Sequence, residues 1–312
     1  MRQKQNYTFK KSIWFWLLLV FILIVTLISI NLLSKEGEND ISLMHVHGLG
    51  FTNDGTQLLI PAHEGLVSFT EGRWKAVSGK KHDYMGFTMV DNGFYSSGHP
   101  EFRSKELKNP LGIVKSTDNG KTLEILDLHG VEDFHGMAVG YQSHTIYVIN
   151  PRPNERMSEA GLYVSNDEAK SWTRSQATGV IGNVTSIAAH PTDPGTVVIG
   201  TSDGVFLSND FGNLFEKLSI EQEVTALAFG KTGDLFIGGQ GTLNLLTENN
   251  SINKLNIPDL KEDVMIYIAQ NPQSESEIAF ATSNKDVYIS WDAGLNWNQI
   301  AVQGITQAVS GE

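Results

Sequence analysis

The chain has 312 residues, with 23 Lys and Arg against 35 Asp and Glu, and it contains no cysteine. The lack of cysteine excludes disulfides and a lipid-modified N-terminal cysteine, so a domain outside the cytoplasm depends on its own hydrophobic core. The net charge of −12 argues against nucleic acid or an anionic lipid surface as the partner and is compatible with cations.

The first feature along the chain is an apolar run, residues 13–33, that carries no charge and only three polar side chains. A run of this length is sufficient to cross a bilayer as a helix. Four cations precede it and the first acidic residue is Glu36, so the positive-inside rule predicts a cytoplasmic N-terminus and an extracytoplasmic remainder. A cleaved signal peptide is the competing interpretation, but the run exceeds a typical h-region and no small-x-small cleavage site follows.

These observations divide the chain into four parts. We expect a basic cytoplasmic tail at residues 1–11, a transmembrane signal-anchor helix at 12–33, a linker at 34–41 and one extracytoplasmic domain at 42–312. Without the four N-terminal cations, 19 of the 23 Lys and Arg remain in the extracytoplasmic part, together with all 35 Asp and Glu. The expected net charge outside the membrane is therefore −16. The anchor predicts localisation in the cell membrane, with a single pass.

An eight-residue pattern occurs four times in the extracytoplasmic part, at residues 116–123, 165–172, 208–215 and 290–297. The opening serines are 49, 43 and 82 residues apart. Because 82 is twice 41, a further degenerate copy is expected near residues 247–255. A period in the forties combined with short strands is typical of propeller blades.

The pattern has a structural explanation. Its Asp accepts hydrogen bonds from backbone N–H groups just ahead, and a Gly two residues later adopts the positive φ that closes a tight hairpin. This is the pattern of an Asp-box, and turn chemistry accounts for all of its residue types. Ala169 stands where Gly is expected, so we predict a strained or differently shaped turn there.

Alignment on this turn, between the third and fourth strands of a blade, gives six blades. They cover residues 44–77, 84–126, 134–174, 184–218, 224–255 and 264–300. In blade 4 the strands are expected at 184–189, 196–201, 205–208 and 214–218, and residues 304–309 are a candidate closing strand. The predicted fold is therefore all-β, a six-bladed β-propeller with Asp-box turns, preceded by one N-terminal transmembrane helix.

The histidines are unevenly distributed over this alignment. The loops between second and third strands share one face with the crossings between blades, opposite the Asp-box turns. Seven of the nine histidines map to the first face, all in blades 1 to 3: His45, His47, His63, His82, His99, His129 and His135. The same blades carry the long loops 98–111 and 150–160. Since binding sites lie on loops held by a rigid scaffold, this face is the candidate site.

Clustering favours a functional role, although a single histidine is more often a hydrogen-bonded structural group. His47 and His135 begin the first strands of blades 1 and 3, and Met85 holds the same position in blade 2. Imidazole with thioether suits copper and imidazole alone suits zinc, but no spacing here is diagnostic. The candidate metal ligands are His47, His63, His99 and His135. The further candidate ligand-binding residues are His45, Asp83, Met85, Arg103 and Asp133.

Several segments of blades 1 to 3 resemble a bacterial family of BNR/Asp-box propellers, usually labelled glycosylhydrolase or sialidase-like. They are HVHGLG at 45–50, MGFT at 85–88, SGHP at 97–100, NPLGIVKSTDNGKT at 109–122 and DFHGMAV at 133–139. Blades 4 to 6 are similar only to generic BNR, sortilin-like repeats. The resemblance implies an exported or membrane-anchored propeller whose hydrolase label derives from its repeats, and fold alone is a weak argument for activity.

The residues do not support the sialidase label. Sialidases that look like this family carry a three-arginine clamp, a Tyr nucleophile paired with Glu, an Asp acid and a Phe/Tyr-Arg-Ile-Pro segment, which this chain lacks. Only Arg103, Arg152 and Arg156 map to the candidate face, all in long loops that do not favour a rigid clamp. Other glycosidases need two carboxylates about 5 to 10 Å apart. The candidates are Glu64, Asp83, Glu101, Glu132 and Asp133.

Three functional hypotheses follow. The favoured one is a membrane-anchored extracytoplasmic propeller that binds a small-molecule, glycan or protein ligand, or a copper or zinc ion, on its histidine-rich face, with no catalytic residue assigned. The second is a glycoside hydrolase that uses carboxylates on that face. The third is a protein-interaction or assembly scaffold, as in propellers that resemble photosystem assembly factors.

Overall fold

The computed structural model describes residues 16, 19–22, 24, 26, 41–220 and 222–308. The chain divides into two compact units, Met1–Ile41 and Ser42–Glu312. In the first unit the described residues between 16 and 26 are helical. Most of the predicted anchor lies outside the described residues, and no helix within the described part is long and apolar enough to cross a membrane.

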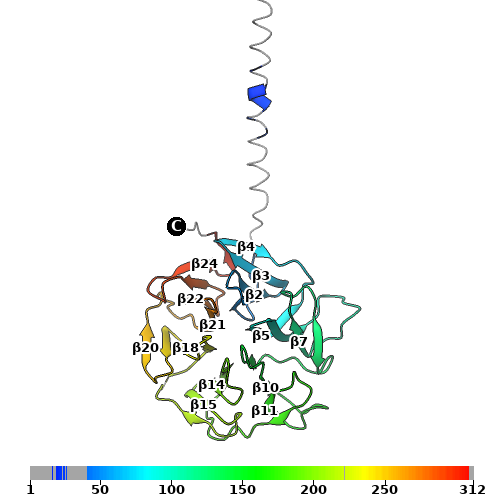
Figure 1. Ribbon diagram of the computed structural model, residues 1–312, viewed down its shortest axis with the longest axis vertical. Coiled ribbons are helices and arrows are strands. Elements are labelled where there is room, and N and C mark those ends of the chain that lie inside the picture. Colours follow the sequence, from blue (N-terminus) through cyan, green and yellow to red (C-terminus); the bar gives the residue numbers. More distant parts are fainter. Residues whose placement is uncertain are drawn as a thin grey trace, which may run out of the picture. The chain divides into compact units, whose positions relative to one another are not determined.

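The second unit is the predicted six-bladed β-propeller, with the strands of each blade in sequence order and antiparallel (Figure 1). Blade 1 contains β1 (Gly50–Phe51), β2 (Leu58–Ala62), β3 (Gly65–Thr70) and β4 (Arg73–Ala76), and blade 2 contains β5 (Asp83–Val90), β6 (Gly93–His99), β7 (Ile113–Ser116) and β8 (Glu124–Asp127). Blade 3 contains β9 (Met137–Val139), β10 (Ile146–Asn150), β11 (Gly161–Ser165) and β12 (Thr173–Arg174), and blade 4 contains β13 (Val184–Ala189), β14 (Val197–Thr201), β15 (Gly204–Ser208) and β16 (Glu216–Lys217). Blade 5 contains β17 (Ala226–Phe229), β18 (Leu235–Gly239), β19 (Thr242–Leu246) and β20 (Ile252–Leu255), and blade 6 contains β21 (Met265–Asn271), β22 (Ser274–Thr282), β23 (Val287–Ser290), β24 (Asn298–Val302) and β25 (Ile305–Thr306).

The innermost strands form a closed ring. Strands β1, β5, β9, β13, β17 and β21 each contact the next, and β21 contacts β1. The C-terminal strand β25 pairs with β24 as a fifth strand of blade 6, and Ser42 forms a bridge with Ile305. The Trp74 indole of blade 1 also donates to the carbonyl oxygens of Ile300 and Gln307, each at 3.0 Å. Residues near both ends of this unit therefore join blades 6 and 1.

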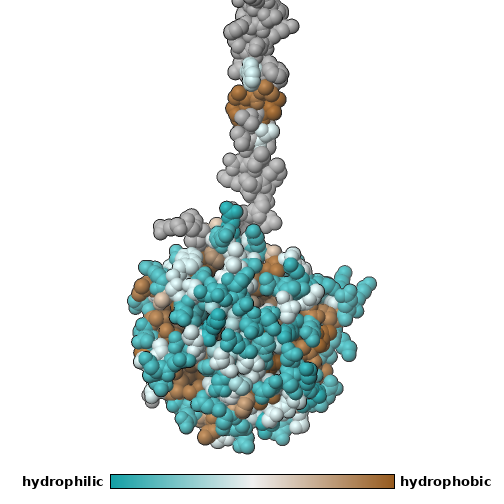
Figure 2. Space-filling model, in the orientation of Figure 1, coloured by the Kyte–Doolittle hydropathy of each residue, from teal (hydrophilic) through white to brown (hydrophobic). Residues whose placement is uncertain are grey.

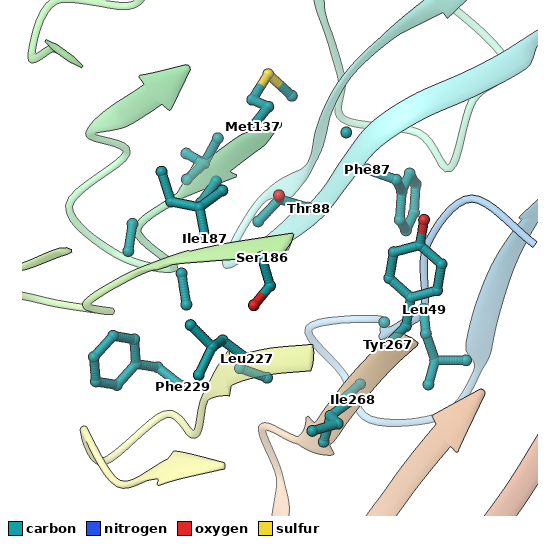
Figure 3. Close-up of a pocket in the computed structure, with 18 of the residues that line it drawn as sticks. Leu49, Phe87, Thr88, Met137, Ser186, Ile187, Leu227, Phe229, Tyr267 and Ile268 are labelled. Carbon is teal, nitrogen blue, oxygen red and sulfur yellow. The ribbon is translucent and has the colours of Figure 1, made fainter. Parts of the chain in front are cut away.

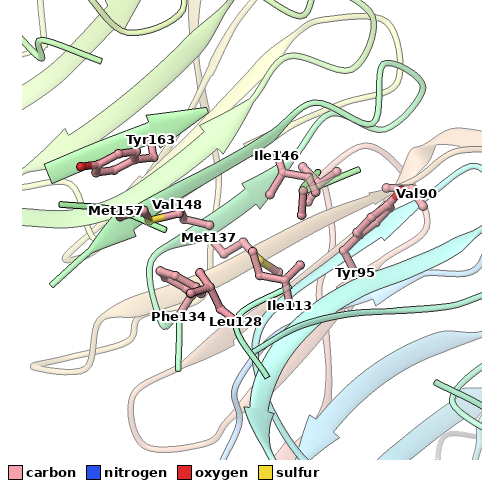
Figure 4. Close-up of a cluster of buried hydrophobic side chains, with 12 residues drawn as sticks. Val90, Tyr95, Ile113, Leu128, Phe134, Met137, Ile146, Val148, Met157 and Tyr163 are labelled. Atoms are coloured by element: carbon pink, nitrogen blue, oxygen red, sulfur yellow. The ribbon is translucent and has the colours of Figure 1, made fainter. Parts of the chain in front are cut away.

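The hydrophobic core lies between neighbouring blades. Separate buried clusters fill the junctions of blades 1 and 2, 2 and 3, 3 and 4, 4 and 5, and 5 and 6. Figure 4 shows the cluster between blades 2 and 3, in which Tyr95 and Ile113 of one blade meet Phe134 and Met137 of the other. The face seen in Figure 2 is mainly hydrophilic, with hydrophobic residues in separate patches. Each blade is thus held by its two neighbours.

The four repeat turns, defined as the copies of the eight-residue pattern, share one set of hydrogen bonds. The opening Ser hydroxyl donates to the Asp two residues later at 2.7–2.9 Å. It accepts the backbone N–H four residues later at 2.8–3.0 Å. The Asp side chain accepts the backbone N–H of the residue four positions later in the chain at 2.8–2.9 Å. The Ser hydroxyl therefore has as large a role as the Asp, which the sequence argument overlooked.

Ala169 keeps this geometry. Its N–H donates to Ser165 Oγ at 3.0 Å, and its φ of 64° is close to the 79° of Gly212. The expectation of a differently shaped turn is wrong, because the hydrogen bonds impose the same left-handed backbone on alanine, where a Cβ makes it strained. The degenerate copy expected near residues 247–255 is the turn between β19 and β20, where Thr247 donates to Asn249 at 2.5 Å.

We expect Ser208→Ala to lower the free energy of unfolding by about 1–3 kcal/mol, since it leaves the buried N–H of Gly212 without its acceptor. Ser208 is 1% exposed. Leu214→Ala, which trims an exposed side chain of the same turn, is the matched control and should cost less than about 0.5 kcal/mol. Denaturant unfolding measures both. Equal losses in the two variants would contradict this role of the hydroxyl.

Candidate functional site

A cavity of about 730 Å³ occupies the centre of the ring and is lined by the innermost segments of all six blades (Figure 3). His47, Asp133 and His135 line one end of the cavity, and they lie just before the first residues of β1 and β9. This end of the cavity opens on the face that carries the loops between the second and third strands of each blade. We call the group formed by His45, His47, His63, Asp83, His99, Asp133 and His135 the histidine mouth.

Buried aromatic residues position the carboxylates of this mouth. Phe134 is 0% exposed in the junction of blades 2 and 3, and its N–H donates to Ser97 Oγ at 2.9 Å. Since alternate side chains of an extended segment point to opposite sides, Asp133 and His135 lie together on the side away from the core. Asp83 similarly precedes the buried Tyr84 at the start of β5. It is the register partner of His99 on β6.

The Asp83 carboxylate contacts two imidazoles from blade 1. His63 Nδ1 lies 3.0 Å from Asp83 Oδ2, and His47 Nε2 lies 3.5 Å from Asp83 Oδ1. The His45 ring stacks on the ring of His47 and meets the ring of His63 edge-on, with a centroid distance of 5.7 Å in each pair. Three histidines of one blade therefore gather around the carboxylate of the next.

The Asp133 carboxylate contacts two further imidazoles. Asp133 Oδ2 lies 3.0 Å from His135 Nε2 and 3.3 Å from His99 Nε2. The other ring nitrogen of His99, Nδ1, lies 2.6 Å from Asn109 Oδ1. The mouth is thus two carboxylates, each between two histidines, and it takes residues from blades 1, 2 and 3.

Both carboxylates keep one unsatisfied oxygen. The Asp83 and Asp133 side chains are 14% and 15% exposed. Oδ1 of each is buried and makes no hydrogen bond, although His47 Nε2 lies 3.5 Å from Asp83 Oδ1. A buried polar atom without a partner is costly and requires a water, an ion or a ligand group. Each of these two atoms can accept a hydrogen bond or contact a cation.

The imidazoles also interact with one another. The pKa of His47 is lowered, first by burial and then by the nearby His45, His135 and His63, while the Asp83 carboxylate opposes the shift. These histidines are therefore close enough to repel as cations. A lowered pKa keeps the His47 imidazole neutral near pH 7, and a neutral imidazole has a lone pair for a ligand.

In three rings of the mouth one nitrogen faces a carboxylate, and the opposite nitrogen has no hydrogen-bond partner within the described residues: His47 Nδ1, His63 Nε2 and His135 Nδ1. This is the arrangement that commonly supports a metal-bound histidine from behind. As the side chains stand, however, no three His, Asp or Glu groups of the described part of the chain are placed to hold one metal ion together.

Met85 and Arg103 lie apart from this group. Met85 is buried in β5, and Gly86 rather than Met85 lines the cavity. The Arg103 guanidinium lies over the Phe102 ring, 5.1 Å from its centroid, in an exposed loop. Sequence reasoning missed Asn109, the partner of His99, because nothing in a lone Asn before Pro110 indicates its contact.

Three histidines outside the mouth have structural roles. His82 Nδ1 accepts the N–H of Glu101 at 3.0 Å, His129 Nε2 accepts that of Lys108 at 2.8 Å, and His190 Nδ1 accepts that of Asp193 at 3.0 Å. Burial lowers the pKa of all three. A neutral ring that accepts a backbone hydrogen bond is the ordinary use of histidine in a fold.

The other charged residues of this face have partners of their own. Arg152 Nε pairs with the buried Glu132 at 3.0 Å, and Arg156 Nε pairs with Asp127 at 2.8 Å. With Arg103 on Phe102, the three candidate arginines are engaged by three different partners and form no sialidase-like clamp. Glu64 and Glu101 both contact Lys81. Of the five candidate carboxylates, Asp83 and Asp133 are the two that contact the histidines.

No protein-family model matches the chain. A xyloglucanase from Hypocrea jecorina (strain QM6a) is 35% identical over 89 residues, which are 27% of this chain and 11% of that protein. The chain therefore spans about a tenth of the length of this curated relative.

Solved structures share the propeller fold. The GH74 enzyme from Niastella koreensis superposes with a TM-score of 0.54 and 14% identity, covering 84% of this chain and 45% of that one. The GH74 xyloglucanase from Xanthomonas campestris has a TM-score of 0.51 and 15% identity, covering 84% and 46%. A protein described as the extracellular domain of a hybrid two-component system from B. thetaiotaomicron has a TM-score of 0.52 and 16% identity, covering 88% and 35%. The chain thus spans less than half of each, and the similarity is one of fold.

Proposed function

We propose that the protein binds a divalent transition-metal ion, zinc or copper, at the histidine mouth. The observation that carries the proposal is the pair of buried Asp83 and Asp133 oxygens without partners, set among imidazoles that have free ring nitrogens. A carboxylate behind an imidazole fixes its tautomer and makes it a better ligand. An unsatisfied buried carboxylate oxygen is itself stabilised by a nearby cation.

In this proposal His47 Nδ1, His63 Nε2 and His135 Nδ1 supply the ligand nitrogens, and His99 completes the set when its ring turns away from Asn109. Binding requires rotation of the rings, since they do not yet converge on one point. The side chains of His63 and His135 are 52% and 69% exposed, so they have room to turn. First-shell bonds near 2.0–2.1 Å would then draw the rings of blades 1 and 3 together.

The donor set narrows the choice of metal. Imidazole nitrogens and carboxylate oxygens are at the mouth, and the thioether of Met85 is buried elsewhere. Imidazole with carboxylate suits zinc or copper(II), whereas copper(I) prefers sulfur. Calorimetric titration of the EDTA-treated full-length chain with zinc chloride or copper sulfate should show one ion bound per chain. Heat of dilution alone, for both metals, would contradict the proposal.

Glycoside hydrolysis is the second candidate. Two observations favour it: Asp83 and Asp133 lie at one mouth, and the chain is similar over 89 residues to a xyloglucanase. Hydrolysis by a pair of carboxylates needs no metal, so release of reducing sugar from xyloglucan should survive EDTA and disappear in Asp83→Asn and Asp133→Asn. A chain that neither binds metal nor cleaves the polysaccharide would favour the third hypothesis, an interaction or assembly scaffold.

We further propose that the propeller is displayed outside the cytoplasmic membrane and anchored by residues 12–33. The support is the charge asymmetry around that segment, with four cations before it and the first acidic residue, Glu36, after it. Protease added to intact protoplasts should therefore digest the propeller and spare cytoplasmic marker proteins. Protection of the propeller, or recovery of a soluble form that begins near Ser34, would contradict the anchored topology.

A further inference from the structure

The cavity below the histidine mouth has a different chemistry from the mouth. Its lining combines aliphatic and aromatic side chains, among them Leu49, Phe87, Ile187, Leu227 and Ile268, with the hydroxyls of Thr88, Ser186 and Tyr267 (Figure 3). Its volume of about 730 Å³ lies within the range of pockets that bury small organic ligands. The apolar part of this lining favours an apolar guest, because water gains no hydrogen bonds from it.

Polar groups interrupt this apolar lining, and Ser186 Oγ is buried without a hydrogen-bond partner. Tyr267 of β21 lines the cavity with its hydroxyl directed toward Phe87, and it makes no side-chain hydrogen bond within the described residues (Figure 3). Burial raises the pKa of Tyr267, so its hydroxyl remains a neutral donor. The innermost strand of every blade is also an edge strand, whose unpaired backbone groups border the cavity, which we also call the channel. A guest with one or two acceptor atoms would satisfy such groups.

We propose that the channel is a binding site for one small, neutral, mainly apolar molecule that carries a carbonyl or similar hydrogen-bond acceptor, with Tyr267 as the donor to that acceptor. His47 and His135 line the mouth end of this cavity, and the rest of its lining contains no histidine.

The fluorescent ketone 6-propionyl-2-(dimethylamino)naphthalene tests this inference. It is neutral and apolar, it has one carbonyl acceptor, and its emission moves to shorter wavelength in apolar surroundings and to longer wavelength when the carbonyl is hydrogen-bonded. Added to the full-length chain in EDTA, it should bind saturably at one site per chain. Leu227→Trp and Ile187→Trp, which fill the channel from neighbouring blades, should each weaken binding at least tenfold.

Two further variants separate the channel from other sites. Leu295→Trp adds the same side chain at an exposed position of blade 6 and should leave affinity unchanged. Tyr267→Phe should weaken binding about two- to tenfold, as expected for one net hydrogen bond, and shift the bound emission to shorter wavelength. Thermal unfolding identifies any variant that fails to fold.

Equal affinity in the wild type and in both folded channel-filling variants would overturn the inference, as would the absence of saturable binding to the wild type. An unchanged emission maximum in Tyr267→Phe would remove Tyr267 as the donor. Because EDTA is present throughout, failure of metal binding leaves these outcomes unaffected, and failure here leaves the metal titration unaffected.

Discussion

The double variant His47→Ala/His135→Ala should lose zinc and copper binding, with affinity reduced at least about 100-fold, while the propeller remains folded. In the proposed metal site the two side chains supply ligand nitrogens from different blades, and removing them leaves His63 and His99 without the neighbours needed to complete a coordination shell. Each lies at the rim of the cavity and outside the hydrophobic clusters, so little packing is lost. Calorimetric titration measures the affinity, and thermal unfolding measures the fold.

The matched control removes two histidines from elsewhere. In His144→Ala/His190→Ala the lost rings pair with Asp91 and with the backbone of Asp193, away from the mouth. Metal affinity should be the same as in the wild type. If the control loses affinity as strongly as the double variant of the mouth, the metal binds through histidines in general, and the proposed site is wrong.

The second large effect concerns the core residue behind the mouth. Phe134→Ala should lower the free energy of unfolding by about 3–5 kcal/mol, because a fully buried phenyl ring is replaced by a cavity between blades 2 and 3. It should also weaken metal binding, because Asp133 and His135 depend on Phe134 for their position. Denaturant unfolding and metal titration of the same sample measure the two effects.

Phe206→Ala distinguishes general destabilisation from loss of positioning. Phe206 is similarly buried, but it lies in the cluster between blades 3 and 4, which contains no residue of the mouth. Its replacement should cost a comparable free energy of unfolding and leave the metal affinity unchanged. Similar affinities for the two variants would mean that Phe134 does not position the ligands.

The fold could be predicted because the information is local and repeated. A Ser, an Asp and a residue with left-handed backbone recur at blade spacing, and each copy builds its own turn. In blade 4 the predicted first strand, 184–189, coincides with β13 (Val184–Ala189). The outer strands are less predictable, and β16 (Glu216–Lys217) is shorter than the expected 214–218, because the outermost strand has a neighbour on one side only.

The site was predictable as a face and not as a set of contacts. The blade alignment predicts which histidines lie on the face of the mouth, but the partners of Asp83 and Asp133 come from three blades, whose relative placement no local pattern contains. Met85 shows where the blade alignment fails to predict a contact. Its position matches that of His47 by alignment, but an irregularity in the register between Met85 and Thr88, with Gly86 at a φ of 55°, leaves Met85 buried.

Gly86 also explains why the register shift between Met85 and Thr88 is tolerated in β5. A Cβ at Gly86 would lie 2.5 Å from the carbonyl oxygen of Phe134, closer than any side chain allows. The glycine therefore lets blade 2 approach the segment of blade 3 that carries Asp133 and His135. This close approach between blades is a tertiary constraint, and a single sequence reveals it only as one more glycine.

Anomalous X-ray diffraction from crystals grown with zinc, recorded above and below the zinc absorption edge, would locate a bound zinc ion. We expect one strong anomalous peak at the histidine mouth, about 2.0–2.1 Å from nitrogens of His47, His63 and His135, with Asp83 and Asp133 still behind their rings. A map with no peak there, in which the imidazoles keep only their contacts to the two carboxylates, would contradict metal binding at the mouth.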